Sequence, residues 1–198
     1  MKIVFSTRNA SKLSQFQRLF SQAGIELCSL DDIGYTREVV EDSGTFEGNS
    51  FLKANQVAKD TGWIAIGDDS GLSIDALGGR PGVDTALYAG GEKVARLQRL
   101  NTLLQEMRDK LDRKARLECY LTCVLQDGTV LRHNACIEGE ISTKIVNLDG
   151  GMTFEPVFVP KGFNVCMSEM DMDTKLSISH RALATQKLIK DLFESHVI

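Results

Sequence analysis

Two adjacent carboxylates, Asp68 and Asp69, follow an apolar run and precede a Ser-Gly pair. Neighbouring negative charges beside a buried segment are unfavourable unless a cation meets them. Glu41 and Asp42, in an upstream polar loop, supply further carboxylate oxygens. Mg²⁺ binds through one or two carboxylates and completes its octahedron with water and substrate phosphate. The pattern therefore indicates a magnesium site, with a simple turn cap before Ser70 as the alternative.

A second polar cluster, STRNASK, occupies residues 6–12 between a short apolar run and a helical spacing of Leu and Phe. Backbone N–H groups at a helix start, with Thr7, Asn9, Ser11 and Lys12 beside them, can bind an anion such as phosphate. The turn lacks the glycines of a Walker motif. An ordinary helix cap with a surface lysine is the alternative.

A third cluster lies near the end of the sequence, where SISHRALATQK places His180 and Arg181 at a predicted helix start. Lys175, just upstream, adds another cation. A structural histidine beside a surface arginine is the alternative interpretation.

Composition limits the classes of partner. The chain has 198 residues and a net charge of −4, and without a Lys/Arg tract a broad nucleic-acid surface is not expected. Five scattered cysteines without a C-x-x-C pair indicate neither disulfides nor zinc, so we interpret them as small buried residues. The opening residues do not resemble a signal peptide, and no apolar run approaches ~20 residues. We therefore expect a soluble, cytoplasmic protein that does not bind membranes.

The periodicities predict the elements that position these clusters. Apolar runs predict strands at 2–6, 25–30 and 63–67, with helices after the first and before the third. A stripe from Leu97 to Leu111 predicts one long amphipathic helix for core or subunit contact. Strict alternation over 116–125 and an Asp-Gly turn at 127–128 predict two antiparallel strands, and a last helix is expected at about 180–195.

Early β-turn-α units followed by a long hairpin predict an α/β fold. We expect a mixed twisted sheet with helices on its faces, and two lobes flanking a central cleft. One domain over residues 1–198 is expected to contain both lobes.

Four ordered motifs resemble the inosine triphosphate pyrophosphatase family over the whole chain. The family turn T-G-N-x-x-K appears at residues 7–12, and T-F-x-E-N-A-x-x-K-A at 45–54. The long motif D-D-S-G-L-x-V-D-x-L-x-G-x-P-G-V appears at 68–83, and S-H-R at 179–181. The resemblance implies that the cleft binds a nucleotide and that the reaction is Mg²⁺-dependent hydrolysis of ITP, dITP or XTP to the monophosphate and pyrophosphate.

The resemblance also implies a role for each matching residue. Glu41 and Asp69 would hold Mg²⁺, and Asp69 would be the base that activates water. Asp68 would be either a partial ligand or a neighbour of the ligands that does not touch the ion. A homodimer is expected from the same resemblance. The triphosphate would contact Thr7, Arg8, Asn9, Ala10, Ser11, Lys12, Lys53 and Ser70, and the base and sugar would contact Met152, Thr153, Phe154, Glu155, Lys175, His180 and Arg181.

The chain departs from the family pattern at several positions. Arg8 replaces a glycine, Gln15 and Gly48 each replace a glutamate, and residues 151–158 read GMTFEPVF where the family has G-F-G-Y-D-P-x-F. Two alternatives follow from these departures. One is a pyrophosphatase that prefers modified pyrimidine triphosphates, and the other is a nucleotide-binding sensor without turnover.

Overall fold

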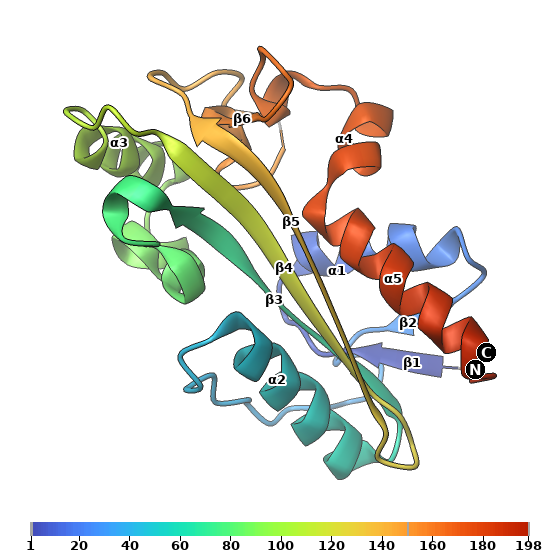
Figure 1. Ribbon diagram of the computed structural model, residues 1–198. Coiled ribbons are helices and arrows are strands. Elements are labelled where there is room, and N and C mark those ends of the chain that lie inside the picture. The colour runs from blue at the N-terminus through green and yellow to red at the C-terminus, as the bar shows by residue number, and fades with distance from the viewer. Residues whose placement is uncertain (1, 150, 198) are drawn as a thin grey trace. The chain divides into compact units, whose positions relative to one another are not determined.

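The computed structural model describes residues 2–149 and 151–197. Six strands form one sheet in the order β2-β1-β3-β4-β5-β6 (Figure 1). β1 pairs in parallel with β2 and β3, whereas β5 and β6 pair antiparallel, so the predicted mixed sheet is confirmed. The strands are β1 Lys2–Phe5, β2 Glu26–Cys28, β3 Ile64–Ile74, β4 Lys114–Val124, β5 Val130–Ile141 and β6 Phe158–Pro160.

Helices accompany the sheet, and the chain divides into two compact units. The first unit comprises Met1–Asp69, Cys119–Ala135 and Arg181–Ile198, and the second comprises Ser70–Glu118 and Cys136–His180. β3, β4 and β5 therefore contribute residues to both units. A single domain stays a prediction. The helices are α1 Ala10–Ser21, α2 Phe46–Thr61, α3 Arg96–Glu106, α4 Met172–Ile178 and α5 His180–Glu194.

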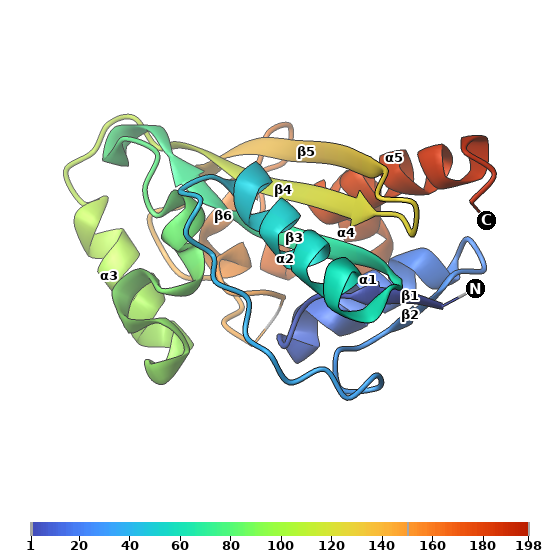
Figure 2. The ribbon, with the colours of Figure 1, turned by 90° about the horizontal axis from the view of Figure 1, so that it is seen from below.

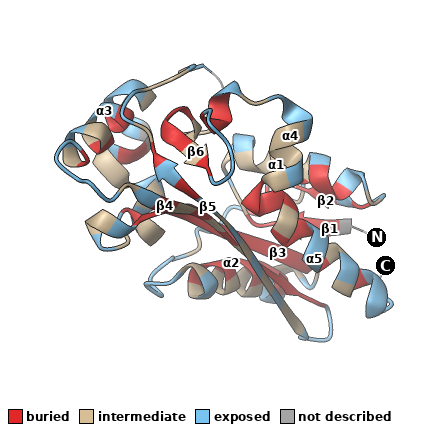
Figure 3. Cartoon of the chain, turned by 45° about the horizontal axis from the view of Figure 1, so that its top comes forward, coloured by how far each residue is buried: buried red, intermediate tan, exposed pale blue. Residues whose placement is uncertain are grey.

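In the first unit, helices cover both faces of the parallel strands. α2 lies on one face, and α1 and α5 lie on the other (Figures 1 and 2). Ala54 and Val57 of α2 pack in a cluster with Val4, while the rings of Phe5 and Phe16 lie 4.5 Å apart. Because both faces are covered, β1 and β3 are coloured as buried in Figure 3.

In the second unit, a separate core forms around the later part of β3. Leu72 and Ile74 pack with Leu100 and Leu103 of α3 and with Phe158 of β6. These side chains are fully buried. Two cores, one in each unit, thus support the two ends of β3.

The acidic pair lies inside a strand rather than in front of a turn. β3 was expected to end near residue 67, but it continues to Ile74 and is buried along its whole length. Leu72 and Ile74 enter the second core, which keeps the strand extended through Ser70 and Gly71. The turn-cap alternative is therefore wrong.

The leucine stripe is shorter than predicted. α3 ends at Glu106, and Leu111 is fully exposed. Arg113 donates from Nη1 to the Met107 carbonyl at 2.8 Å, which satisfies a group at the helix end. The chain can then reverse into β4, so Leu111 lies in the connecting turn.

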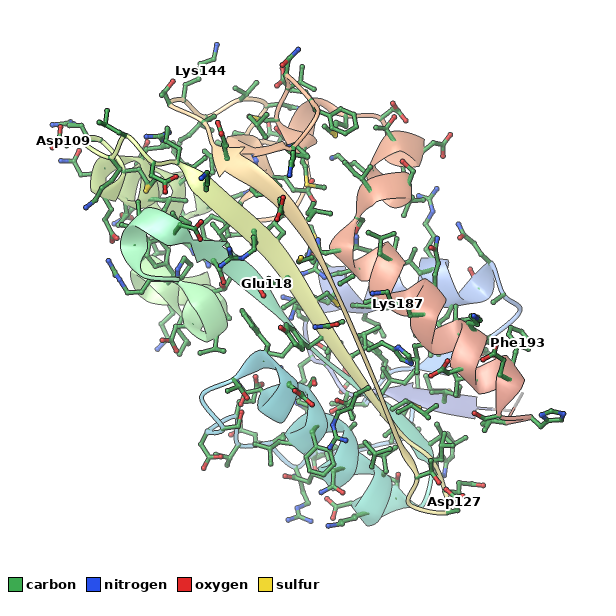
Figure 4. All side chains as sticks on the ribbon, in the orientation of Figure 1. Asp109, Glu118, Asp127, Lys144, Lys187 and Phe193 are labelled. Atoms are coloured by element: carbon green, nitrogen blue, oxygen red, sulfur yellow. The ribbon has the colours of Figure 1, made fainter. Side chains whose placement is uncertain are left out.

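The cysteines and helices agree with most of the remaining expectations. All five cysteines are free and four are buried, but Cys136 is exposed because alternate residues of β5 face solvent. Asp127 lies in the turn between β4 and β5 (Figure 4), where Gly128 adopts a positive φ of 88°. Among the described residues, we find no helix with both the length and the apolarity that a bilayer span requires.

Candidate active site

The first polar cluster forms the turn from β1 into α1. Asn9 is the N-cap of α1, and its Oδ1 accepts from the Lys12 backbone N–H at 3.0 Å. Thr7 Oγ1 accepts from the Asn9 N–H at 3.2 Å. The cap is therefore confirmed, but Lys12 is not a surface lysine, since its side chain is only 18% exposed and pairs with Asp68. The cap remains compatible with an anion site, because the first turn of a helix presents N–H groups and a positive dipole end.

Arg8, which stands where the family has glycine, ties this turn to the loop after β2. Its guanidinium donates to the Tyr35 carbonyl at 2.8 Å and to Asp31 Oδ1 at 3.3 Å. The side chain is about half exposed. Arg8 thus connects the α1 turn to the segment that leads to Glu41.

Gly67 brings α2 against β3. A Cβ at Gly67 would lie 2.1 Å from the Ser50 carbonyl and 2.9 Å from Lys53 Cβ. Only glycine allows this approach, and it places Lys53 Nζ 2.9 Å from the Asp68 carbonyl oxygen. The Lys53 ammonium therefore reaches the acidic pair from the α2 face.

Lys53 is the cation that meets Asp69. Its Nζ lies 3.2 Å from Asp69 Oδ1 and 2.6 Å from Glu41 Oε2. Burial alone would lower the pKa of Lys53, but the charges of Asp69 and Glu41 outweigh it and raise that pKa. The ammonium therefore stays charged, and two predicted metal ligands converge on it.

Asp68 meets a different cation. Lys12 Nζ donates to its Oδ2 at 2.7 Å, and the Cys119 thiol donates to its Oδ1 at 3.4 Å. Burial would raise the pKa of Asp68, but Lys12 and Arg181 lower it to about 2. Asp68 is therefore a permanently charged partner for the cations of the first unit. Burial also raises the pKa of the Cys119 thiol well above its usual value, so the thiol keeps its proton.

Asp69 has the opposite pKa shift. Burial raises its pKa, and the neighbouring charge of Asp68 adds to this, while Lys53 and Lys12 offset part of it. Asn49 Nδ2 donates to Asp69 Oδ2 at 3.3 Å. A carboxylate with a raised pKa is a better proton acceptor near neutral pH than an ordinary aspartate.

Ser43 fixes the orientation of Asn49. Its hydroxyl donates to Asn49 Oδ1 at 2.8 Å, and its backbone N–H lies 3.2 Å from the same oxygen. Because the amide oxygen faces Ser43, the amide NH₂ faces Asp69. A Cβ at Gly48 would lie 2.3 Å from Ser43 Oγ, which accounts for glycine at this position.

Arg181 lies in the first unit with the acidic pair. Its Nη1 donates to Gln15 Oε1 at 3.1 Å. Its charge lowers the pKa of Asp68, with an effect second to that of Lys12. Gln15, on α1, thus holds the arginine from the α1 side. The prediction that Arg181 faces the base stays a prediction.

Apart from Arg181, the residues predicted to contact the base lie in the second unit. The base-side loop, residues 152–155, leads into β6. Glu155 Oε2 lies 3.1 Å from Lys175 Nζ, and a Cβ at Gly151 would lie 1.8 Å from that oxygen. The ring of Phe154 is buried in the second core. Phe154 is thus a packing residue within its unit, whereas Glu155 and Lys175 form a charged pair.

Ser70 and His180, the other predicted contacts of the second unit, are both buried. The first unit therefore unites the phosphate turn, Lys53, Glu41 and the acidic pair, and the second unites the base-side loop with Lys175. Sequence reasoning assigned no role to Asn49, although it lies in a quoted motif. It also missed Cys119 and Arg96, whose partners are distant in sequence.

The carboxylates of the first unit fit a hard divalent cation. Glu41 and Asp69 already face one common cationic group, and carboxylate oxygens are preferred ligands of Mg²⁺. Both oxygens of Asp68 face protein donors instead. Within residues 2–149 and 151–197, no group of three or more His, Cys, Asp or Glu forms a complete metal site. A metal there would need ligands from water and substrate.

Comparisons with known proteins identify the family of the chain. A sequence model of the Ham1 family matches residues 3–191. The dITP/XTP pyrophosphatase of Bacillus licheniformis is 40% identical over 189 residues, covering 94% of this chain and 95% of the relative. The protein of the same name from Bacillus subtilis is 37% identical, with 94% of each chain covered.

Solved structures agree with the fold as well. The Ham1 protein of Staphylococcus aureus has a TM-score of 0.88 at 28% identity, covering 98% of this chain and 100% of that one. A HAM1 protein from Coxiella burnetii has a TM-score of 0.87 at 30% identity, covering 98% and 99%. Because sequence and structure match over nearly the whole length, the chain belongs to the Ham1 family, as its four motifs predicted.

Proposed function

We propose that this protein is a nucleoside triphosphate pyrophosphohydrolase that acts on deaminated purine nucleotides: ITP, dITP and XTP. The names of its relatives support this substrate class. The observation that carries the proposal is that Asp68 and Asp69 each meet a separate lysine beside the N-terminus of α1, at 2.7 Å from Lys12 and 3.2 Å from Lys53. Their pKa values shift in opposite directions. Separated pKa values in adjacent acids are typical of acid–base chemistry.

The triphosphate binds to the first unit. Its anionic oxygens meet the N-terminus of α1, where the backbone of residues 7–12 and Lys12 supply N–H donors and charge. Lys53 adds a second ammonium. These cations neutralise phosphate charge, which supplies most of the rate enhancement in phosphoryl-type reactions.

The reaction requires one water and one base. The water oxygen attacks the α-phosphorus, the bond from that phosphorus to the α,β-bridging oxygen breaks, and pyrophosphate leaves. Asp69 accepts the proton of the attacking water. Asn49 holds the Asp69 carboxylate in place while this proton moves.

We assign Mg²⁺ to Glu41 and Asp69. When bound, the ion neutralises phosphate oxygens and makes water more acidic. Asp68 holds Lys12 in place instead, because its two oxygens already face Lys12 and Cys119. Of the two roles that the sequence resemblance implied for Asp68, we thus choose the neighbour of the ligands over the partial ligand.

We assign the base to the second unit, at the base-side loop with Lys175 and His180. Selectivity follows from a donor-only group that meets the 6-oxo acceptor of hypoxanthine or xanthine. Arg181 stays the predicted donor for this contact. Adenine would leave such a donor unpaired, at a cost of ~1–3 kcal/mol. A homodimer stays part of the proposal, and light scattering after size exclusion tests it.

Pyrophosphate release from a panel of triphosphates tests the proposal. We expect release from dITP, ITP and XTP with Mg²⁺, much less from dATP and pyrimidine triphosphates, and none with a chelator. Asp69→Asn should lower turnover ~10²-fold or more. Asp127→Asn, at the exposed turn labelled in Figure 4, is the matched control and should keep full turnover.

Each alternative predicts a different pattern of pyrophosphate release from the same panel. Release from modified pyrimidine triphosphates with little from dITP would replace the purine assignment. Binding without release from any nucleotide would make the protein a sensor and end the enzyme proposal.

A further inference from the structure

Arg96, the first residue of α3, binds the backbone of the base-side loop and of the turn before it. Its Nη1 donates to the Leu148 carbonyl at 2.6 Å, and its Nε donates to the Thr153 carbonyl at 3.2 Å. Its Nη2 donates to the Met152 carbonyl. One guanidinium thus accounts for three carbonyl groups within the second unit.

The segment that Arg96 holds consists of turns and bends. Residues 148–149 and 151–153 are turn or bend residues, between β5 and β6. A planar guanidinium has five N–H donors in a fixed fork, so it can order several carbonyl groups at once. Arg96 therefore donates hydrogen bonds to backbone carbonyl groups of this segment, whereas in the sheet the neighbouring strands donate them.

Arg99 contacts the same loop through the side chain of Phe154. It lies one turn after Arg96 on the same face of α3, and its guanidinium carbon is 5.7 Å from the centre of the Phe154 ring. Its Nη2 also donates to the Thr85 carbonyl at 2.9 Å. The N-terminal half of α3 thus contacts both the backbone and the ring of the loop.

We propose that Arg96 is a positioning residue for base recognition. It holds the base-side loop in its binding conformation through backbone carbonyl groups, without touching the nucleotide. The inference rests on the proposed function, because the base is assigned to that loop there. A loop ordered before the ligand arrives does not lose freedom on binding, so the contact strengthens base binding by preorganisation. Loss of Arg96 should therefore weaken binding of the base and leave binding of the triphosphate unchanged.

Steady-state kinetics with matched variants test this separation. Arg96→Met removes the donors and keeps an unbranched side chain, Arg96→Lys restores one charged group, and Arg108→Met is an exposed control just beyond α3. We expect Arg96→Met to raise KM for dITP and XTP about tenfold or more with a much smaller change in kcat. Arg96→Lys should recover part of the loss, and Arg108→Met should match the wild type.

Tripolyphosphate, which has no base, reports on the phosphate site alone. Its inhibition constant against dITP hydrolysis should be the same in Arg96→Met and in the wild type. A parallel rise in this constant and in KM would overturn the inference, because it would mean general damage to the site.

Amide hydrogen exchange in the nucleotide-free protein provides a readout that does not depend on catalysis. We expect faster exchange at residues 151–155 in Arg96→Met and unchanged exchange in α2 and β3. If Arg96→Met does not fold, Arg96→Lys is measured in the same two assays, with smaller effects of the same sign expected.

The failures are distinguishable. Active wild-type enzyme with unchanged dITP KM in Arg96→Met would overturn this inference alone, as would unchanged exchange of the loop. Wild-type protein that releases no pyrophosphate from dITP or XTP would overturn the proposed function, and with it the role of the loop in base recognition.

Discussion

Asp68 and Asp69 are adjacent in sequence, yet their pKa values shift in opposite directions. Successive residues of a strand point to opposite faces, so Asp68 faces Lys12 of α1 and Asp69 faces Lys53 and Asn49 of α2. Asp68 receives a full ion pair with Lys12, whereas Asp69 shares Lys53 with Glu41. Different partners, rather than different burial alone, separate the two acids.

The lowered pKa of Asp68 predicts an acid-sensitive contribution to stability. Its value falls from 3.8 to about 2 on folding, so the folded state favours the charged form. The contribution is complete above pH ~4, amounts to about 2 kcal/mol, and is lost as the pH falls from ~4 to ~2. Asp68→Asn should therefore lower the free energy of unfolding at pH 7 by about this amount.

Urea titrations at a series of pH values measure this difference. The gap between wild type and Asp68→Asn should close on acidification, while Asp109→Asn, an exposed carboxyl labelled in Figure 4, should give no such gap. A gap that stays constant from pH 7 to pH 2 would contradict the assignment of the lowered pKa to Asp68.

At the scale of elements, the contact between α2 and β3 positions the lysine of the site. Gly67→Ala would place a methyl group 2.1 Å from the Ser50 carbonyl, so α2 must move away and carry Lys53 with it. We expect a loss of ~1–3 kcal/mol in unfolding free energy, as for other overpacked cores, and a clear loss of turnover. Thermal unfolding and dITP hydrolysis measure the two effects.

Gly24→Ala is the matched control for this prediction. Gly24 has a positive φ of 73° and open space around its Cβ position, so alanine there introduces backbone strain without a collision. It should lower stability by ~1–2 kcal/mol and leave turnover unchanged. Equal turnover in both variants would contradict the role of the α2 approach.

At the scale of the whole molecule, local patterns predicted most of the fold. The spacing of apolar residues predicted α1, α2 and α5, because each depends on neighbours within a few turns. β3 was predicted too short, since Ser70-Gly71 has the composition of a turn and only the second core keeps it extended.

The candidate site was likewise predicted only in part. Lys12, Lys53 and the acidic pair were predicted from motifs, and the structure brings them together. Cys119 and Arg96 were missed because their partners, Asp68 and the base-side loop, lie about fifty or more residues away. No local spacing marks such contacts, so only the folded chain reveals them.

The shared strands predict cooperative unfolding of the two units. β3, β4 and β5 each supply residues to both, so the order of either unit depends on strands that continue through the other. Leu103→Ala, in the core of the second unit, should lower stability by ~2–5 kcal/mol. It should also shift the urea midpoint of Trp63, the single tryptophan of the chain, which lies in the first unit.

Leu111→Ala, at a fully exposed site, is the control and should leave the Trp63 midpoint unchanged. An unshifted midpoint in Leu103→Ala would show that the two units unfold independently.

The close approach of Ser43 to Gly48 limits which substitutions this sequence can accept. Any side chain at position 48 collides with Ser43, and moving Ser43 releases the amide of Asn49 that faces Asp69. The glutamate usual in the family therefore requires Ser43 to shift or to be replaced. The two sites form an epistatic pair in which the order of mutations matters, and a single-site scan would score position 48 as intolerant for a reason that lies five residues upstream.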